Sequence, residues 1–183
     1  MPESPLDSVL VSAVAGEPWA LSRLYEDLAP AVLGYLRVRG AREPEDLTSE
    51  VFLAVFTRLA TVSGGASGLR TLLFSVAHAR LVDDLRRRAR RQDPVAFDAR
   101  SDPRTTASAE DQALEAQSLA AVRELIGGLP DDQRDVLLMR LVAELTVDQV
   151  AEVMGRTSGA VKQLQRRGLL TLKGRLSSSG VPL

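Results

Sequence analysis

The 183-residue sequence contains no cysteine and only one histidine, His78. Without cysteine the chain forms no disulfide, holds no zinc through thiolates and has no cysteine nucleophile. One histidine excludes a histidine metal cluster and any mechanism that needs two histidines. No apolar run approaches the roughly 20 residues that span a bilayer as a helix, and MPESPLDS lacks the basic start and apolar centre of a signal peptide. We expect a cytoplasmic protein that inserts in no membrane and binds no cofactor or metal.

Acidic residues are absent from the C-terminal part of the chain, because none follows Glu152. The same part is rich in Arg and Lys, and a second basic run, RRRARR, occupies residues 86–91. The formal net charge of the whole chain is only −1, so its charges are segregated rather than in excess. Local positive fields attract phosphate even on a nearly neutral molecule. The distribution therefore indicates nucleic acid, although either run alone is typical of a solvated surface.

Apolar residues recur at helical spacings of 3 and 4, and no segment alternates as a strand does. We predict helices in the first half of the chain over residues 6–15, 18–39, 43–62 and 69–91. Pro30 is expected to kink or split the second of these helices, and Gly40 is expected to end it. Pro44 stands near the first turn of the third, where proline and neighbouring acids favour a helix N-terminus. The glycine-rich stretch SGGASG separates the third helix from the fourth.

The composition changes between residues 92 and 111, which include prolines and small or acidic residues but few large apolar ones. Such a segment has little to bury and is typical of a flexible linker. It separates a first helical domain at 1–91 from a second at 112–176, and residues 177–183 are predicted to be a disordered tail. The sequence thus predicts an all-α protein of two small helical domains joined by a flexible linker.

The second domain contains the pattern of a helix-turn-helix. A short helix is predicted to begin after its N-cap, Thr146, and Gly155 permits the sharp turn because glycine tolerates a positive φ. Thr157 or Ser158 can cap the helix that follows. In this motif the second helix enters the major groove of DNA. The alternative is an ordinary helical hairpin in which Gly155 simply ends a helix.

The second helix of the motif has an inward and an outward side. Val161 and Leu164 are predicted to point inward and hold the helix to its partner. The outward residues can reach base edges or phosphates, and they are Ser158, Gly159, Lys162, Gln163 and Arg166. Arg and Lys suit guanine, and Gln suits adenine. The turn spacing and the acid-free basic face together favour DNA binding over the hairpin.

Three stretches together resemble a known family. EDLTSEVFLAVF is similar to region 2.2 of the sigma-70 family of transcription initiation factors. LRTLLFSVAHARLVDDLRRRARR resembles regions 2.3 and 2.4, and LPDDQRDVLLMRLVAELTVDQVAEVMGRTSGAVKQLQRRGLLTLKGRL resembles region 4. Their order and spacing, with a short linker in place of a third domain, resemble the extracytoplasmic-function (group IV) type.

This resemblance implies a factor that binds core RNA polymerase, recognises the -35 and -10 promoter elements and promotes DNA opening. The first domain would bind the clamp helices of the polymerase β′ subunit and open the -10 element. The second would bind the β flap and read the -35 element. The resemblance also implies an anti-sigma factor that holds the protein inactive by covering these faces.

The resemblance assigns roles to individual residues. Those implied to face core polymerase are Asp46, Ser49, Glu50 and Leu53. The loop at 63–68 and the helix after it would handle the non-template strand. Residues assigned to -10 DNA are Arg70, His78, Arg80, Arg86, Arg87, Arg88, Arg90 and Arg91. Residues assigned to -35 DNA are Arg156, Thr157, Ser158, Gly159, Lys162, Gln163, Arg166 and Arg167. The family usually has Gln, Trp and Asn where this chain has Ser49, Leu72 and Ala79.

An enzyme and an autonomous transcriptional regulator are the two alternatives to an initiation factor. An enzyme is not expected, because the chain has no nucleophile–base constellation and adjacent acids such as Asp83 and Asp84 do not face each other on a helix. An autonomous helix-turn-helix regulator, with the first domain used for dimerisation or ligand sensing, is the main alternative. LTSEVFL and LRRRARR favour the initiation factor.

Overall fold

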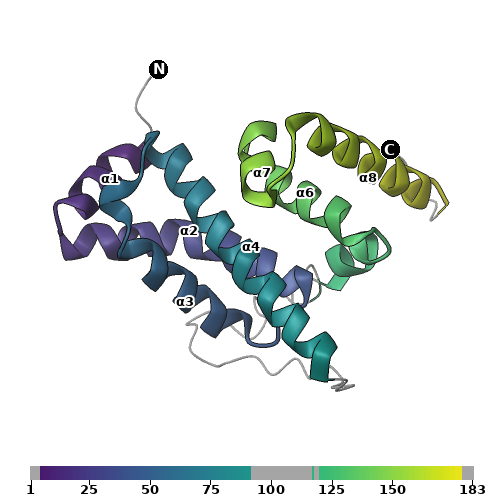
Figure 1. Ribbon diagram of the computed structural model, residues 1–183, viewed down its shortest axis with the longest axis horizontal. Coiled ribbons are helices and arrows are strands. Elements are labelled where there is room, and N and C mark those ends of the chain that lie inside the picture. The colour runs from purple at the N-terminus through teal and green to yellow at the C-terminus, as the bar shows by residue number, and fades with distance from the viewer. Residues whose placement is uncertain (1–4, 92–116, 118–119, 179–183) are drawn as a thin grey trace.

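The computed structural model describes residues 5–91, 117 and 120–178, and every regular element among them is helical (Figure 1). The predicted all-α class is therefore confirmed for the described part of the chain. Residues 92–111, predicted to be a linker, and most of the predicted tail at 177–183 lie outside the described residues. The proposed domain limits remain predictions.

The first domain consists of four α-helices and one short 3-10 turn. These are α1 (Pro5–Val14), α2 (Pro18–Arg39), α3 (Pro44–Phe56), η1 (Leu59–Thr61) and α4 (Gly65–Arg91). Pro18 and Pro44 occupy the first turns of their helices, where the missing N–H costs nothing. Gly40 ends α2 in the left-handed conformation, with a φ of 78°, as predicted from its position after the last apolar residue.

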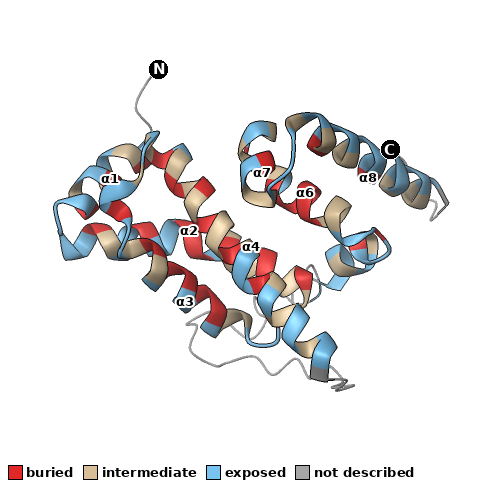
Figure 2. Cartoon of the chain, viewed as in Figure 1, coloured by how far each residue is buried: buried red, intermediate tan, exposed pale blue. Residues whose placement is uncertain are grey.

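The interior of the first domain is formed by the apolar stripes that the spacing predicted. Leu24 and Val32 of α2, Val51 of α3 and Leu81 of α4 are fully buried. Figure 2 shows the buried residues on the sides of the helices that face one another, with exposed residues outside. Burying a large aliphatic side chain stabilises a fold by about 1.5–3 kcal/mol relative to leaving it in water. The four helices are therefore held by a shared apolar core.

Three predicted helix boundaries in this domain are wrong. The helix predicted over 43–62 ends as α3 at Phe56, and the separate 3-10 turn η1 follows it. Pro30 does not split its segment, because α2 runs without a break from Pro18 to Arg39. Pro30 is exposed, while Leu28 and Val32 on either side of it are buried. Proline in a helix interior costs about 3 kcal/mol, and packing of both halves of the helix against the core outweighs that cost.

The third wrong boundary is the start of the fourth helix, which begins at Gly65 rather than at 69. The last four residues of the stretch predicted to be a loop, 65–68, therefore form the first turn of α4. An acid from α1 explains the earlier start, because the Asp7 Oδ1 atom accepts a hydrogen bond from the Ala66 N–H at 2.6 Å. A carboxylate stabilises a helix N-terminus by satisfying its free N–H groups. This capping residue lies 59 positions away in sequence, so no local pattern marks it.

The second domain has a helical segment at 120–127 and the helices α6 (Asp131–Leu141), α7 (Val147–Met154) and α8 (Ser158–Ser178). Its interior contains Val136, Met139, Val150 and Val161, all fully buried. Gly168 allows α8 to approach α6 closely, because a Cβ atom there would lie 2.9 Å from Leu137 Cδ1.

The second domain lies against the first, with α6 next to α2 and α7 next to α4 (Figure 1). Figure 1 shows α8 on the far side of α7 from α4. The docking of the two domains was not predicted from the sequence. It places the start of the helix-turn-helix beside the glycine-rich start of α4.

The start of α4 provides a test of this packing. Replacing Gly68 by Ala places a Cβ on the Ser63 carbonyl oxygen, a backbone atom that cannot rotate away. We expect a loss of about 1–3 kcal/mol in the free energy of unfolding, the usual cost of overpacking. The matched control is Gly34→Ala in α2, where a Cβ meets nothing within 4 Å and should stabilise the helix by up to about 1 kcal/mol. Urea denaturation of both variants checks this, and equal midpoints would contradict the described turn.

Candidate nucleic-acid and polymerase interface

The helices α7 and α8 form the predicted helix-turn-helix. Thr146 is the N-cap of α7 in a complete capping box, in which the Thr146 hydroxyl accepts from the Gln149 N–H and Gln149 Oε1 accepts from the Thr146 N–H. Gly155 ends α7 with a φ of 60°, a conformation that favours glycine. Thr157, rather than Ser158, caps α8, because its Oγ1 atom accepts from the Ala160 N–H at 3.2 Å. The turn is thus built by the residues that the sequence indicated.

The recognition helix α8 separates its two sides as predicted. Val161 is fully buried, and Leu164 packs partly buried against the core. The exposed residues assigned to -35 DNA are Arg156, Thr157, Gly159, Lys162, Gln163, Arg166 and Arg167. Ser158 is only half-exposed, because its hydroxyl hydrogen-bonds to Asp148 Oδ1 at 2.5 Å. Arg156 is held by an ion pair with Asp132.

Two exposed leucines on α8 were missed. Leu169 and Leu170 are 45% and 59% exposed, and they line a shallow apolar groove together with Lys162, Arg166 and Lys173. Exposed apolar side chains next to cations are typical of a surface that binds another molecule. The sequence does contain a signal for this surface, because the two leucines lie three or four residues from Arg166 and Lys173.

The basic end of α4 exposes some of its arginine side chains. Arg86, Arg87 and Arg90 are exposed. Arg88 is only half-exposed and donates a hydrogen bond to the Gly40 carbonyl at 2.6 Å, so it closes the C-terminal end of α2. Arg91 is the last residue of α4, and its side chain lies outside the described residues.

The predicted polymerase face forms one side of α3. Asp46, Ser49, Glu50 and Leu53 are all exposed, and spacings of 3 and 4 place them along one stripe of the helix. Leu53 is 68% exposed, so the stripe contains one apolar side chain among polar ones. Glu50 pairs with Arg80 of α4, with Oε2 and Nη1 2.9 Å apart. Glu50, which the resemblance assigns to polymerase binding, thus contacts Arg80, which it assigns to -10 DNA binding.

The segment expected to handle the non-template strand borders a cavity of about 400 Å³. Hydroxyl and glycine residues from the loop before α4 and from its first turns line one side, including Ser63, Ser67 and Thr71. Gln149 and Glu152 of α7 line the other side. Arg70, assigned to -10 DNA, pairs with Glu144 of the second domain at 3.3 Å. The second domain therefore covers part of this segment.

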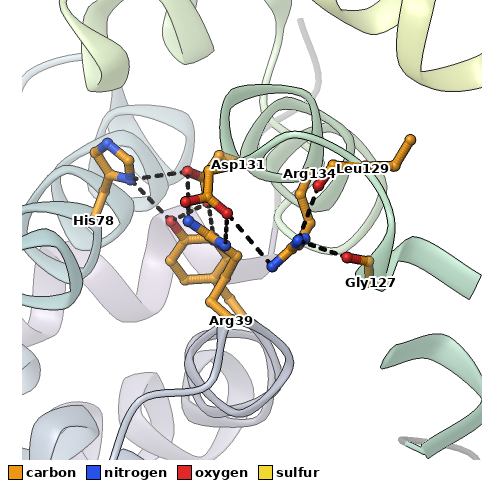
Figure 3. Close-up of polar contacts among 8 residues, drawn as sticks. Arg39, His78, Gly127, Leu129, Asp131 and Arg134 are labelled. Carbon is orange, nitrogen blue, oxygen red and sulfur yellow. Dashed lines mark hydrogen bonds and ion pairs between the residues drawn. The ribbon is translucent and has the colours of Figure 1, made fainter. Parts of the chain in front are cut away.

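A buried polar cluster joins the domains and includes His78 (Figure 3). Arg39 Nε donates to Asp135 Oδ1 at 2.5 Å, and both side chains are almost completely buried. The Tyr35 hydroxyl donates to the same oxygen at 3.0 Å and lies 2.9 Å from His78 Nδ1. Arg39 also pairs with Asp131 at 3.0 Å. His78, predicted as a DNA residue, is thus engaged in the contact between domains.

Comparisons with known proteins agree with the motifs and the fold. A model of Sigma-70 region 2 matches residues 24–91, and one of Sigma-70, region 4 matches residues 125–174. The ECF RNA polymerase sigma factor SigD of Mycobacterium tuberculosis (strain ATCC 25618 / H37Rv) is 33% identical over 96% of this chain and 85% of its own length. The chain belongs to the sigma-70 family. It is an RNA polymerase sigma factor of the extracytoplasmic-function type.

Two further relatives support the family and the fold. The ECF sigma factor BldN of Streptomyces coelicolor (strain ATCC BAA-471 / A3(2) / M145) is 32% identical over 87% of this sigma factor and 61% of its own length. The structure of CnrH in complex with the cytosolic domain of CnrY superposes with a TM-score of 0.68 at 18% identity, covering 96% of this chain and 99% of CnrH. This last similarity concerns the fold alone.

Two other kinds of site were searched for in the sigma factor. Among the described residues, none of the helices combines the length and the apolarity of a membrane span. In the same part of the chain, no group of three or more histidine or carboxylate side chains is placed to hold a metal ion.

The charge state of His78 follows from its surroundings. Burial is the largest influence on the pKa of His78, and it lowers that pKa. The carboxylates of Asp135 and Asp132 raise the pKa and the Arg39 guanidinium lowers it, so the net pKa lies below its usual value. Burial and then Asp135 raise the pKa of Tyr35 well above its usual value, so the hydroxyl keeps its proton. Because that one hydrogen is donated to Asp135, the tyrosine oxygen accepts from a protonated Nδ1 of His78. The neutral imidazole with its hydrogen on Nδ1 completes the cluster.

The lowered pKa of His78 predicts that the sigma factor loses stability in acid. The unfolded chain takes up a proton on this residue near pH 6.5, before the folded chain does, so stability falls as the pH drops from 7.5 to 5.5. His78 is the only histidine, so its single imidazole signal in an NMR titration should have a midpoint below 6.5. The fall in urea midpoint between these pH values should be smaller in His78→Asn. A midpoint at or above 6.5 would contradict the buried environment.

Proposed function

We propose that this sigma factor contacts core RNA polymerase through α3, single-stranded -10 DNA through α4 and the -35 element through α8. Support for the division comes from the surfaces, because each helix exposes a face with different chemistry. The face of α3 is acidic and contains one exposed leucine, while those of α4 and α8 carry cations. Acidic side chains repel phosphate, so α3 is suited to protein and the other two to DNA.

The observation that carries this proposal is the geometry of α7 and α8. A capped helix, a glycine turn and a second capped helix present Lys162, Gln163 and Arg166 outward on one side. This is the arrangement that places a recognition helix in the major groove. Arg and Lys would contact guanine and Gln would contact adenine, while Arg167 would approach phosphates.

The protein acts by binding rather than by catalysing a reaction of its own. Because core polymerase and promoter DNA occur in the bacterial cytoplasm, we place its action there. An autonomous helix-turn-helix regulator is not favoured, since the region 2 match extends over residues 24–91, which such a regulator would not need.

We also propose an anti-sigma factor as a protein partner. The relative CnrH was solved with the cytosolic domain of CnrY. In this chain the groove of Leu169 and Leu170 is the candidate surface for protein contacts of the second domain, whether with the polymerase β flap or with the inhibitor. Exposed leucines contribute affinity to a protein interface by leaving water, which they cannot do against DNA phosphates.

The assignment of α3 to polymerase predicts a binding defect without unfolding. Replacing Asp46, Glu50 and Leu53 by alanine changes only exposed side chains, so the helical circular dichroism should be unchanged. Pull-down of core polymerase should fall by at least about 10-fold, as expected when interface residues worth 1–2 kcal/mol are lost. The control replaces Ser8, Val11 and Glu17, which are also exposed and include one apolar side chain. Equal binding by both variants would remove α3 from the interface.

The assignment of α8 to the -35 element predicts losses that depend on sequence. Lys162→Ala and Arg166→Ala should each cost about 1–3 kcal/mol at cognate promoters if the contact is to a base. Arg23→Ala is the control, since it removes a charge of the same sign from an exposed position of α2 that has no proposed role in DNA binding. Promoter selection by holoenzyme containing the Gln163→Ala sigma factor should show relaxed preference at one or two -35 bases. If all three variants of the recognition face select the parental -35 sequence, α8 does not read the promoter.

A further inference from the structure

Ser158 is the first residue of the recognition helix α8. The first residues of a recognition helix are those that reach base edges in the major groove. Lys162 follows one helical turn later on the same side of α8. Gly159 has no side chain, and a Cβ added there would lie 4.0 Å from Thr157 Oγ1, so this turn is uncrowded. Ser158 is therefore placed where a base pair can approach it.

The single hydrogen of the Ser158 hydroxyl is directed at a carboxylate. Ser158 Oγ donates to Asp148 Oδ1 across 2.5 Å, and Asp148 belongs to the first turn of α7. Hydroxyl–carboxylate bonds of about 2.5–2.7 Å are charge-assisted and roughly twice as strong as neutral ones. A serine hydroxyl has one hydrogen and two lone pairs. With that hydrogen bound to Asp148, Ser158 has only lone pairs to offer to DNA.

Phosphate is a poor ligand for a hydroxyl held in this way. Phosphate oxygens are negatively charged acceptors, so the Ser158 lone pairs and the Asp148 carboxylate both repel them. Exposed cations of α8 such as Arg167 are better suited to the DNA backbone. Ser158 is thus suited to a base edge rather than to a phosphate.

The four bases differ in what they present to an acceptor. In the major groove, adenine and cytosine each carry an amino group that donates hydrogen bonds, at N6 and N4. Guanine and thymine present oxygen acceptors there, O6 and O4. A side chain limited to accepting therefore binds adenine or cytosine and is repelled by guanine and thymine. A free serine hydroxyl does not discriminate in this way, because it rotates to donate or to accept.

We propose that Asp148 is a positioning residue for promoter recognition, which fixes Ser158 as an acceptor that selects adenine or cytosine at one position of the -35 element. Asp148 acts through the hydroxyl and contacts no base itself. The inference rests on the proposed reading of the -35 element by α8. It adds the chemical class of base that the first turn of this helix reads.

Asp148→Ala removes the carboxylate and keeps the hydroxyl. Ser158 is then free to rotate, so it donates to guanine or thymine as readily as it accepts from adenine or cytosine. Thr146 remains the N-cap of α7, and circular dichroism should show the parental helix content. The control is Glu124→Ala, since it removes a charge of the same sign from an exposed position of the same domain.

Two substitutions at Ser158 test the hydroxyl itself. Ser158→Thr keeps the hydroxyl and its bond to Asp148, so it should retain the parental choice of base. Ser158→Ala leaves a methyl group, which suits the methyl group of thymine. It should therefore lose the preference for adenine or cytosine and accept thymine. Asp148→Ala/Ser158→Ala should match Ser158→Ala, because the carboxylate acts only through the hydroxyl.

The measurement is promoter selection by holoenzyme assembled from core polymerase and each sigma factor. The library randomises the -35 region of a promoter that the parental holoenzyme transcribes. For the parent, Ser158→Thr and Glu124→Ala, we expect one position at which adenine or cytosine is favoured about 3- to 10-fold, the range that one hydrogen bond provides. Asp148→Ala should reduce this ratio below about 2-fold at that position alone. Positions that depend on Lys162 and Arg166 should be unchanged.

Several results would overturn the inference. One is a parental profile without a position that favours adenine or cytosine. Another is a preference at that position that persists in Asp148→Ala or in Ser158→Ala. Loss of preference at every position in Asp148→Ala would also reject it, because the carboxylate would then hold the whole helix rather than one hydroxyl.

Failure of the proposed function would look different. If Lys162→Ala, Arg166→Ala and Ser158→Ala all keep the parental profile, α8 does not read the -35 element, and the inference fails with it. If Lys162→Ala and Arg166→Ala change the profile while Asp148→Ala does not, α8 reads the promoter and only the role of Asp148 is rejected.

Discussion

The buried pair of Arg39 and Asp135 sets how the two domains lie relative to each other. A guanidinium and a carboxylate removed from water each lose several kcal/mol of hydration, which their mutual attraction restores only at close range and with further hydrogen bonds. Tyr35 and Asp131 supply those bonds here. Any shift of α6 along α2 would leave a buried charge without its partner. The pair therefore selects one docking geometry, although it adds little net stability to the docked form.

Three of the arginines that the family resemblance assigned to DNA form exposed ion pairs with acids in this structure. Arg80 contacts Glu50, Arg70 contacts Glu144 and Arg156 contacts Asp132. Exposed ion pairs of this kind contribute about 0–1 kcal/mol, so phosphate can replace the carboxylate at small cost. Such pairs keep the arginines ordered and neutralised in the absence of DNA. The apparent conflict between polymerase and DNA assignments at Glu50 and Arg80 is then a competition between alternative partners.

The parts of the fold that depend on local chemistry were predictable from sequence. The period of apolar residues located the helices, and Thr146, Gly155 and the residues around Thr157 marked the helix-turn-helix. The helix boundaries that were wrongly predicted depend on residues distant in sequence. Asp7 caps the N-terminus of α4, and packing against the core keeps α2 continuous at Pro30. Asp135 follows two acids in the first turn of α6 and looks from the sequence like a third exposed acid of the same helix start. Its partners are 96 and 100 positions away, and no periodicity in a single sequence reveals them. The exposed α3 and α8 faces were predictable, whereas the closure over α4 was not.

Gln149 shows how a local choice of residue can serve the arrangement of domains. Its Oε1 atom is committed to the Thr146 N–H by the capping box, and this fixes which way the amide points. With the oxygen turned to the cap, the NH₂ group faces the start of α4, where Ser67 and Thr71 offer oxygen atoms. A capping box alone is satisfied by Glu or Gln, and at a helix N-terminus the negative charge of Glu would be favourable. The helix accepts either residue at position 149, but the contact with α4 requires the amide, because a carboxylate has no hydrogen to donate to the Ser67 carbonyl.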